Sequence, residues 1–120
     1  MNVVLMQGTL SRDPETRSLP SGDIVMSFDL ATRFADEPAV SAPVVWFDPS
    51  EVGAALAAGD AVVVVGRVRR RFFRSGGSTQ SRTEVVAQRV VPVRHTKRAQ
   101  AAVEQAIAGI VAASAPPRST

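Results

Sequence analysis

The sequence predicts an all-β fold: a five-stranded barrel with one short helix between the third and fourth strands, followed by a C-terminal helical extension. Three observations lead to this prediction. Valine-rich apolar runs of strand length recur over residues 1–93. Turn-forming Pro, Gly and Asp residues separate these runs. A single Ala-rich stretch with helical spacing comes after them.

The first two strands and their turns occupy the N-terminal part of the chain. Residues 3–6 open the first strand, in which Gly8 marks a bulge or bend. Turns are expected at residues 12–15 and 19–22. The segment 24–31 then alternates, as a half-buried antiparallel strand does. Its apolar side is formed by Ile24, Met26, Phe28 and Leu30, opposite Val25, Ser27 and Asp29.

A loop, a third strand and a short helix are predicted next. The polar, Pro-containing stretch 33–43 is expected to be a loop, and residues 44–47 a short strand. Residues 51–58 predict a short helix. Ser50 is its expected N-cap and Gly59 its expected end.

Two long strands complete the predicted barrel. Residues 61–73 and 82–93 are strand-like, and the pair Gly76–Gly77 supplies the hairpin turn between them. A helix between the third and fourth of five strands is the arrangement of an OB-fold barrel. The sequence therefore predicts an OB-fold domain over residues 1–94.

The C-terminal extension, residues 95–120, is predicted to be a helix over 97–113 with a frayed end at 115–118. Val103, Ile107, Ile110 and Val111 have helical spacing. Three roles stay open for this helix: packing on the barrel, assembly of several copies, or partial disorder.

The composition excludes several classes of protein. A chain of 120 residues suits one domain, and 45% hydrophobic residues are too many for a disordered chain. The absence of cysteine excludes disulfides, thiolate zinc sites and cysteine nucleophiles, and it favours the cytoplasm. The N-terminus does not resemble a signal peptide, and no apolar run is long enough to cross a membrane.

Charge is divided unevenly along the chain. Residues 1–60 hold three arginines and nine carboxylates, whereas residues 61–120 hold eleven Arg or Lys residues and only two carboxylates, Glu84 and Glu104. This asymmetry points to an anionic partner for the second half. A solvated basic face is the alternative explanation.

The arginine-rich part of the fourth strand, residues 66–74, is the most informative segment. Alternation places Arg67, Arg69, Arg71 and Phe73 on one face, and Val68, Arg70, Phe72 and Arg74 on the other. Cations that follow phosphates and rings that stack on bases suit single-stranded nucleic acid. In the alternative the arginines only keep a long hairpin soluble. We favour binding because so many neighbouring cations repel one another without an anion. Phe72 is expected in the core.

Further candidate contacts lie in two loops. Arg74 and Arg82 flank the uncharged hairpin tip, which is either a mobile finger that closes over a strand or an idle loop. Phe34 lies beside Arg33 in a polar loop, where it either stacks on a base or pins the loop.

Catalysis has little support in the sequence. His95, the only histidine, has no carboxylate neighbour and is expected to be an exposed linker residue. Asp13 and Glu15 are expected to be turn and surface residues. No residues have metal-ligand or nucleophile-elbow spacing. We expect no enzyme activity, cofactor or metal.

Five motifs, in the correct order over residues 2–93, resemble the bacterial single-stranded-DNA-binding protein family. The first strand keeps that family's Asn-x-Val-x-Leu-x-Gly-x-Leu frame, and an Asp-Pro-Glu turn follows. A Pro-Ser-Gly turn, a Gly-x-Leu-x-x-Arg-x-Trp-like strand and a Thr-Glu-Val-Val strand come later. The matching positions are Asn2, Val4, Met6, Gly8, Leu10, residues 13–15, Arg17, residues 20–22, Leu30, Ala31, Gly66, Val68, Arg71, Phe73 and residues 83–86.

The resemblance implies an OB fold, a homotetramer as the usual assembly, with a dimer also possible, and sequence-independent binding of single-stranded DNA. Phe47 and Phe73 fall on family stacking positions, and Arg71 matches an arginine of the same strand. This favours Phe47 as the exposed member of its pair, with Trp46 inward. The protein would then act in DNA replication, recombination or repair, at the nucleoid.

The chain also departs from that family. Its loop after Ala31 is shorter, and Asp36 and Ser41 stand where aromatic residues would be expected. The family's acidic C-terminal tip is missing, so partners recruited through that tip are not expected. These departures indicate a divergent paralogue. Two alternatives stay open: a basic, primosome-like OB-fold module that docks on another protein and binds DNA weakly, and an RNA-binding OB module.

Overall fold

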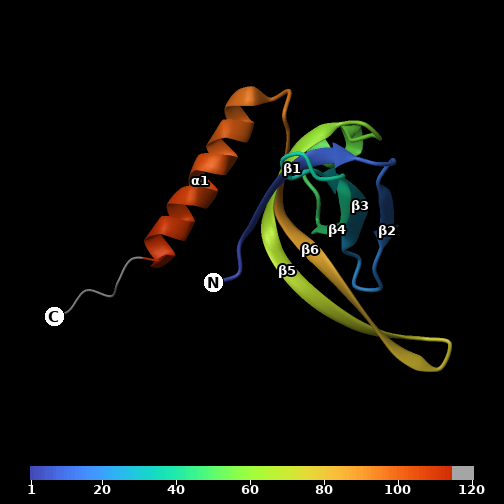
Figure 1. Cartoon of the computed structure of the whole chain (residues 1–120). Coiled ribbons are helices and arrows are strands. Elements are labelled where there is room, and N and C mark those ends of the chain that lie inside the picture. Colours follow the sequence, from blue (N-terminus) through green and yellow to red (C-terminus); the bar gives the residue numbers. More distant parts are fainter. Residues whose placement is uncertain (115–120) are drawn as a thin grey trace.

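The computed structural model of the chain describes residues 1–114 (Figure 1). The frayed end expected over residues 115–118 lies outside this part. Six strands, one 3-10 helix and one α-helix are present in it. Their bounds are β1 Val4–Leu10, β2 Glu15–Ser18, β3 Ile24–Thr32, β4 Val40–Phe47, η1 Glu51–Ala55, β5 Ala61–Ser75, β6 Ser78–Pro92 and α1 Thr96–Ser114.

Five of the six strands close into a ring. The sheet order is β1-β5-β6-β4-β3-β2, and an additional pairing of β1 with β3 joins its ends. All pairs are antiparallel except β4 with β6. This ring, with η1 between β4 and β5, is consistent with the predicted OB-fold arrangement. The expected strand number was wrong, because β2 adds a short sixth strand along the outer edge of β3.

Two glycines lie where strands of the ring approach each other closely. A Cβ atom on Gly8 would overlap the carbonyl oxygen of Ala31, where β1 meets β3. A Cβ atom on Gly66 would overlap the carbonyl oxygen of Val86, beside the β-bulge between Val65 and Gly66. Only glycine fits these positions without a backbone shift.

The core fills the inside of the ring and contains the predicted side chains Met26, Phe28 and Leu30. Two predictions for β3 were wrong. Ile24 is 45% exposed, since it begins the strand beside an exposed turn. Val25 is buried, because its neighbours in the sheet, Arg17 on β2 and Phe47 on β4, lie on the same face and cover it.

Helix α1 packs on the outside of the ring. Ala99 and Ala102 contact Val63, Val65 and Val91, which confirms the first of the three roles, packing on the barrel; assembly of several copies stays a prediction. The predicted apolar stripe was too long. Val103 joins the contact, but Ile107 and Val111 are exposed. No helix among residues 1–114 combines the length and apolarity needed to span a membrane.

Several element bounds differ from the sequence predictions. Strand β4 begins at Val40, inside the expected loop, because it pairs with β3 as far as Thr32. The expected helix over residues 51–58 is the 3-10 helix Glu51–Ala55, and Ser50 makes no side-chain cap. Strands β5 and β6 extend to the predicted two-residue turn, where Gly76 and Gly77 have φ angles of 58° and 81°.

Strands β5 and β6 are longer than the ring requires. Figure 1 shows their joined ends curving away from the other strands as a projecting arm. We use the term hairpin arm for residues 67–82. Val62 to Val65 are buried at the ring end of β5, whereas most residues of the hairpin arm are exposed. The arm thus leaves both of its faces open, except where β4 lies beside it.

Candidate nucleic-acid interface

The register of the hairpin arm determines which side chains share a face. Residues paired across antiparallel strands point to the same side. Arg69 pairs with Glu84, Arg71 with Arg82, and Phe73 with Gln80. One face therefore carries the residues predicted for it, namely Arg67, Arg69, Arg71 and Phe73, together with Glu84 and Arg82 from β6. We call this face the stacking face.

Glu84 is a buried carboxylate at the centre of the stacking face, with 2% of its side chain exposed. Its Oε1 accepts hydrogen bonds from Nη2 of Arg69 at 2.9 Å and from Nε of Arg71 at 3.0 Å. A second, longer bond of 3.3 Å comes from Nε of Arg69. Charge-assisted bonds of this kind are stronger than neutral ones and restrict the guanidinium groups.

Glu84 provides a counter-ion for the arginine row that the sequence did not reveal. Repulsion among neighbouring arginines was taken to require an external anion. The fold supplies an internal one, because Glu84 neutralises part of the charge of Arg69 and Arg71. The need for phosphate at these two positions is therefore weaker, and their geometry becomes the more informative feature.

Each of the two restrained guanidinium groups lies over an aromatic ring. The Cζ atom of Arg69 is 5.4 Å from the ring centre of Phe47, and that of Arg71 is 5.1 Å from the ring centre of Phe73. Both distances are within the range of cation–π attraction. Phe47 comes from β4, where it is 39% exposed while Trp46 is buried, as predicted. These two ring–guanidinium pairs thus come from two strands, with Phe47 on β4 and the other three side chains on β5.

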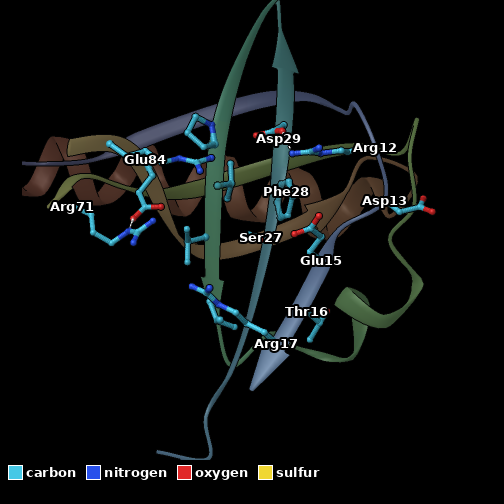
Figure 2. Close-up of a pocket in the computed structure, with 15 residues that line it drawn as sticks. Arg12, Asp13, Glu15, Thr16, Arg17, Ser27, Phe28, Asp29, Arg71 and Glu84 are labelled. Carbon is cyan, nitrogen blue, oxygen red and sulfur yellow. Dashed lines mark hydrogen bonds and ion pairs between the residues drawn. The ribbon is translucent and has the colours of Figure 1, made fainter. Parts of the chain in front are cut away.

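A hollow of about 280 Å³ adjoins the stacking face. Figure 2 shows Arg71 and Glu84 on one side of it, with Arg12 and Glu15 on the other. The hollow has mixed charge: Arg12 forms a 2.9 Å ion pair with Asp29, whereas β2 contributes both Glu15 and Arg17. Its floor is the outer face of β3 and β4, so the open sheet surface continues from the hairpin arm onto the ring.

The remaining predicted contact residues lie in different places. Arg33 and Phe34 are in the exposed β3–β4 loop, with Phe34 79% exposed, and neither lines the hollow. Arg74 is on the opposite face of the arm, where its Nη2 donates to the carbonyl oxygen of Gly77. Phe72, expected in the core, is 67% exposed, because the arm carries it beyond the ring.

The structure adds residues that the sequence argument missed. Glu84 is the principal one, and a signal for it was present: a two-residue turn at Gly76 and Gly77 sets the register, which places residue 84 opposite residue 69. Arg12 and Arg17 also line the hollow. No signal within the sequence of β2 indicated that its side chains face the hairpin arm.

Other chemistry finds little support among the described residues. Within residues 1–114, no three His, Cys, Asp or Glu side chains gather as a metal site would require. His95 was expected to be an exposed linker residue, but it is half-buried, and its Nδ1 atom is buried without a hydrogen-bond partner in this part of the chain. The restrained guanidinium groups and the partly exposed rings are suited to binding planar, anionic polymers.

Comparisons with known proteins identify the family of this chain. The model of the "Single-strand binding protein family" matches residues 1–93. A single-stranded DNA-binding protein of Deinococcus radiodurans is 34% identical over 100 residues, covering 75% of this chain and 33% of the relative. One from Thermus thermophilus is 35% identical over 102 residues, covering 75% and 36%. The chain thus spans about a third of the length of these curated relatives.

Proposed function

The chain belongs to the single-strand binding protein family, a family of non-enzymatic binding proteins, and we propose that it binds single-stranded DNA without sequence preference. The observation that carries the proposal is a pair of ring–guanidinium contacts joined by the buried Glu84: Arg69 over Phe47 and Arg71 over Phe73. Every base has a π-face, so stacking surfaces of this kind tolerate any sequence.

The contacts that each side chain makes within the protein indicate which part of the DNA it binds. We assign base stacking to Phe47 and Phe73, at about 1–3 kcal/mol per base. Arg69 and Arg71 are partly neutralised, so we assign them flat contacts with bases and sugars. Arg67 and Arg82 lie on the stacking face without any ion pair among the described residues, and we assign them the phosphates.

Arg33, Phe34 and Arg74 are proposed contacts of a second kind. None of them lies on the stacking face, and all three are exposed. They would reach the DNA strand only where the DNA leaves the stacking face, along the β3–β4 loop or around the hairpin tip. The DNA strand would then cross the barrel domain, residues 1–94, and α1 of the C-terminal extension packs on the outside of the ring.

We also propose that the protein acts as a homo-oligomer, as a tetramer or a dimer. The support is exposed apolar surface on β1 and its approach, at Met1, Val3 and Leu5, and on α1, at Ile107 and Val111. Contiguous exposed apolar surface is typical of association sites. Such an assembly would serve DNA replication, recombination or repair at the nucleoid in the cytoplasm.

The test is a titration of fluorescent oligo-dT with the purified protein, with the mass of free protein and complex measured by light scattering. We expect saturable binding of dT and of mixed sequences with similar affinity, and a steep loss of affinity with added salt. Absence of saturable binding would refute the proposal.

Matched DNA and RNA oligonucleotides in competition address the RNA-binding alternative, which a clear preference for RNA would support. Feeble DNA affinity together with a stable protein partner in pull-down would support the protein-docking alternative. The open second face of the hairpin arm, with Val68 43% and Phe72 67% exposed, is the observation that favours that alternative.

A further inference from the structure

We propose that a hollow beside Phe47, between the end of β4 and the start of α1, is a second anion-binding site that holds the backbone phosphates of single-stranded DNA as the strand leaves the stacking face. This inference rests on the proposed function and extends it to a part of the chain beyond the barrel. The hollow has a volume of about 330 Å³, at the lower end of the usual range for small-ligand sites.

Continuity with the stacking face is the first argument. Phe47 lies under the guanidinium group of Arg69 and also lines this hollow. A base stacked on Phe47 would therefore place its next phosphate at or near the mouth of the hollow. Other lining residues come from β6, from the turn before α1 and from α1, namely Arg89, His95 and Arg98.

The charge of the lining is the second argument. Arg89 and Arg98 contribute two cations, whereas Asp48 is the carboxylate in the wall, and its Oδ1 lies 3.5 Å from the backbone N–H of Ile24. Arg89 donates a hydrogen bond to the side chain of Gln105. Because Gln105 is neutral, this contact leaves the charge of Arg89 unpaired.

The start of α1 is arranged against the usual electrostatic preference of helices. The positive end of the helix dipole favours acidic side chains, yet the first turn of α1 has none and carries Lys97 and Arg98 instead. Among residues 1–114 neither of these cations forms a salt bridge. Of the two, Arg98 lines the hollow, so a phosphate bound there would pair with its charge near the positive end of the helix dipole.

His95 adds an independent observation. Its side chain lines the hollow, and its Nδ1 atom is buried without a hydrogen-bond partner in the described part of the chain. Buried polar atoms normally have a partner. Because Nδ1 is enclosed in this structure, an N–H there would donate to a phosphate oxygen once the imidazole ring turns toward the hollow.

The test uses the full chain and dT oligonucleotides of two lengths, ~5 and ~15 nucleotides, which lie near the lower and upper ends of the range that a single OB fold covers. Arg98→Ala removes a cation from the wall of the hollow. Arg94→Ala is the matched control, because it removes the same charge four residues earlier from a side chain that does not line this hollow. Circular dichroism confirms that both variants fold.

We expect Arg98→Ala to lower the affinity for the long oligonucleotide about fivefold and to leave the affinity for the short one within twofold of the unaltered protein. The salt slope, which is the slope of log affinity against log salt concentration, should become smaller in magnitude by about 0.7 for the long oligonucleotide. Arg94→Ala should leave both within twofold. Equal behaviour of the two variants, or an equal loss at both lengths for Arg98→Ala, would overturn this inference and leave the proposed function standing. Failure of the unaltered protein to bind either oligonucleotide would overturn the proposed function itself.

Discussion

The two faces of the hairpin arm carry similar side chains in very different surroundings. On the stacking face, Arg69 and Arg71 are held by the buried Glu84, and each lies over a ring. On the opposite face, Phe72 is exposed, and Arg74 bonds to the turn at Gly77. Composition and alternation are almost the same on both faces. The difference comes from what neighbouring strands place beside each one.

This comparison shows what a binding surface needs beyond the right residue types. Flexible arginines lose side-chain freedom on binding, at about 0.5–1.5 kcal/mol for each one immobilised. On the stacking face much of that loss has already occurred during folding, because Glu84 restrains the guanidinium groups before any ligand arrives. The opposite face has no equivalent carboxylate on β6, where Thr83 pairs with Arg70.

The largest effect is expected from removing the two rings of the stacking face. The double substitution Phe47→Ala with Phe73→Ala should weaken oligo-dT binding about 30-fold or more, since two stacked bases lose ~1–3 kcal/mol each. Phe72→Ala is the control on the opposite face and should change affinity less than twofold. Fluorescence titration measures both. Equal losses in the two proteins would show that the faces do not differ in function.

A smaller effect is expected from Glu84→Gln, which removes the shared anion. Arg69 and Arg71 then become mobile and must be ordered on binding, so affinity at high salt should fall about fivefold. The salt slope should become steeper, because both guanidinium groups are free to take phosphates. Glu104→Gln, an equal charge change on exposed α1, is the control. A rise in affinity at high salt with Glu84→Gln would contradict the positioning role.

The smallest effect is expected from Arg82→Gln on the stacking face. It removes one proposed phosphate contact, which should lower affinity roughly threefold at low salt and reduce the salt slope by about 0.7. Arg70→Gln removes the same charge from the opposite face and should leave the slope unchanged. If the two variants shift the slope equally, the arm attracts DNA only through its total charge.

Local rules were sufficient for much of the fold. The apolar runs located the ring strands, and the glycine pair at 76–77 located the hairpin turn. Strand ends were less certain, because pairing with a neighbour extends a strand into polar sequence, as β3 does for the first residues of β4. The four residues of β2 are all exposed and lack an apolar pattern, so only their pairing with β3 defines them as a strand.

The candidate site was predictable in part. Alternation along β5 placed Arg69, Arg71 and Phe73 on one face, because a strand turns successive side chains to opposite sides. The exposure of Phe72 was not predictable from alternation. It lies on the side of the strand that continues the core, and whether that side is covered depends on how far the hairpin arm projects beyond the ring.

The sequence by itself determined the faces of the hairpin arm and, through its two-residue turn, the register that brings Glu84 opposite Arg69. Only the tertiary structure decided that Phe47 lies beneath that arginine and that α1 begins next to Phe47. The physical reason is the distance along the chain over which each effect acts. Alternation and turns act between neighbours in the chain, whereas the parallel pairing of β4 with β6 joins distant segments through closure of the ring.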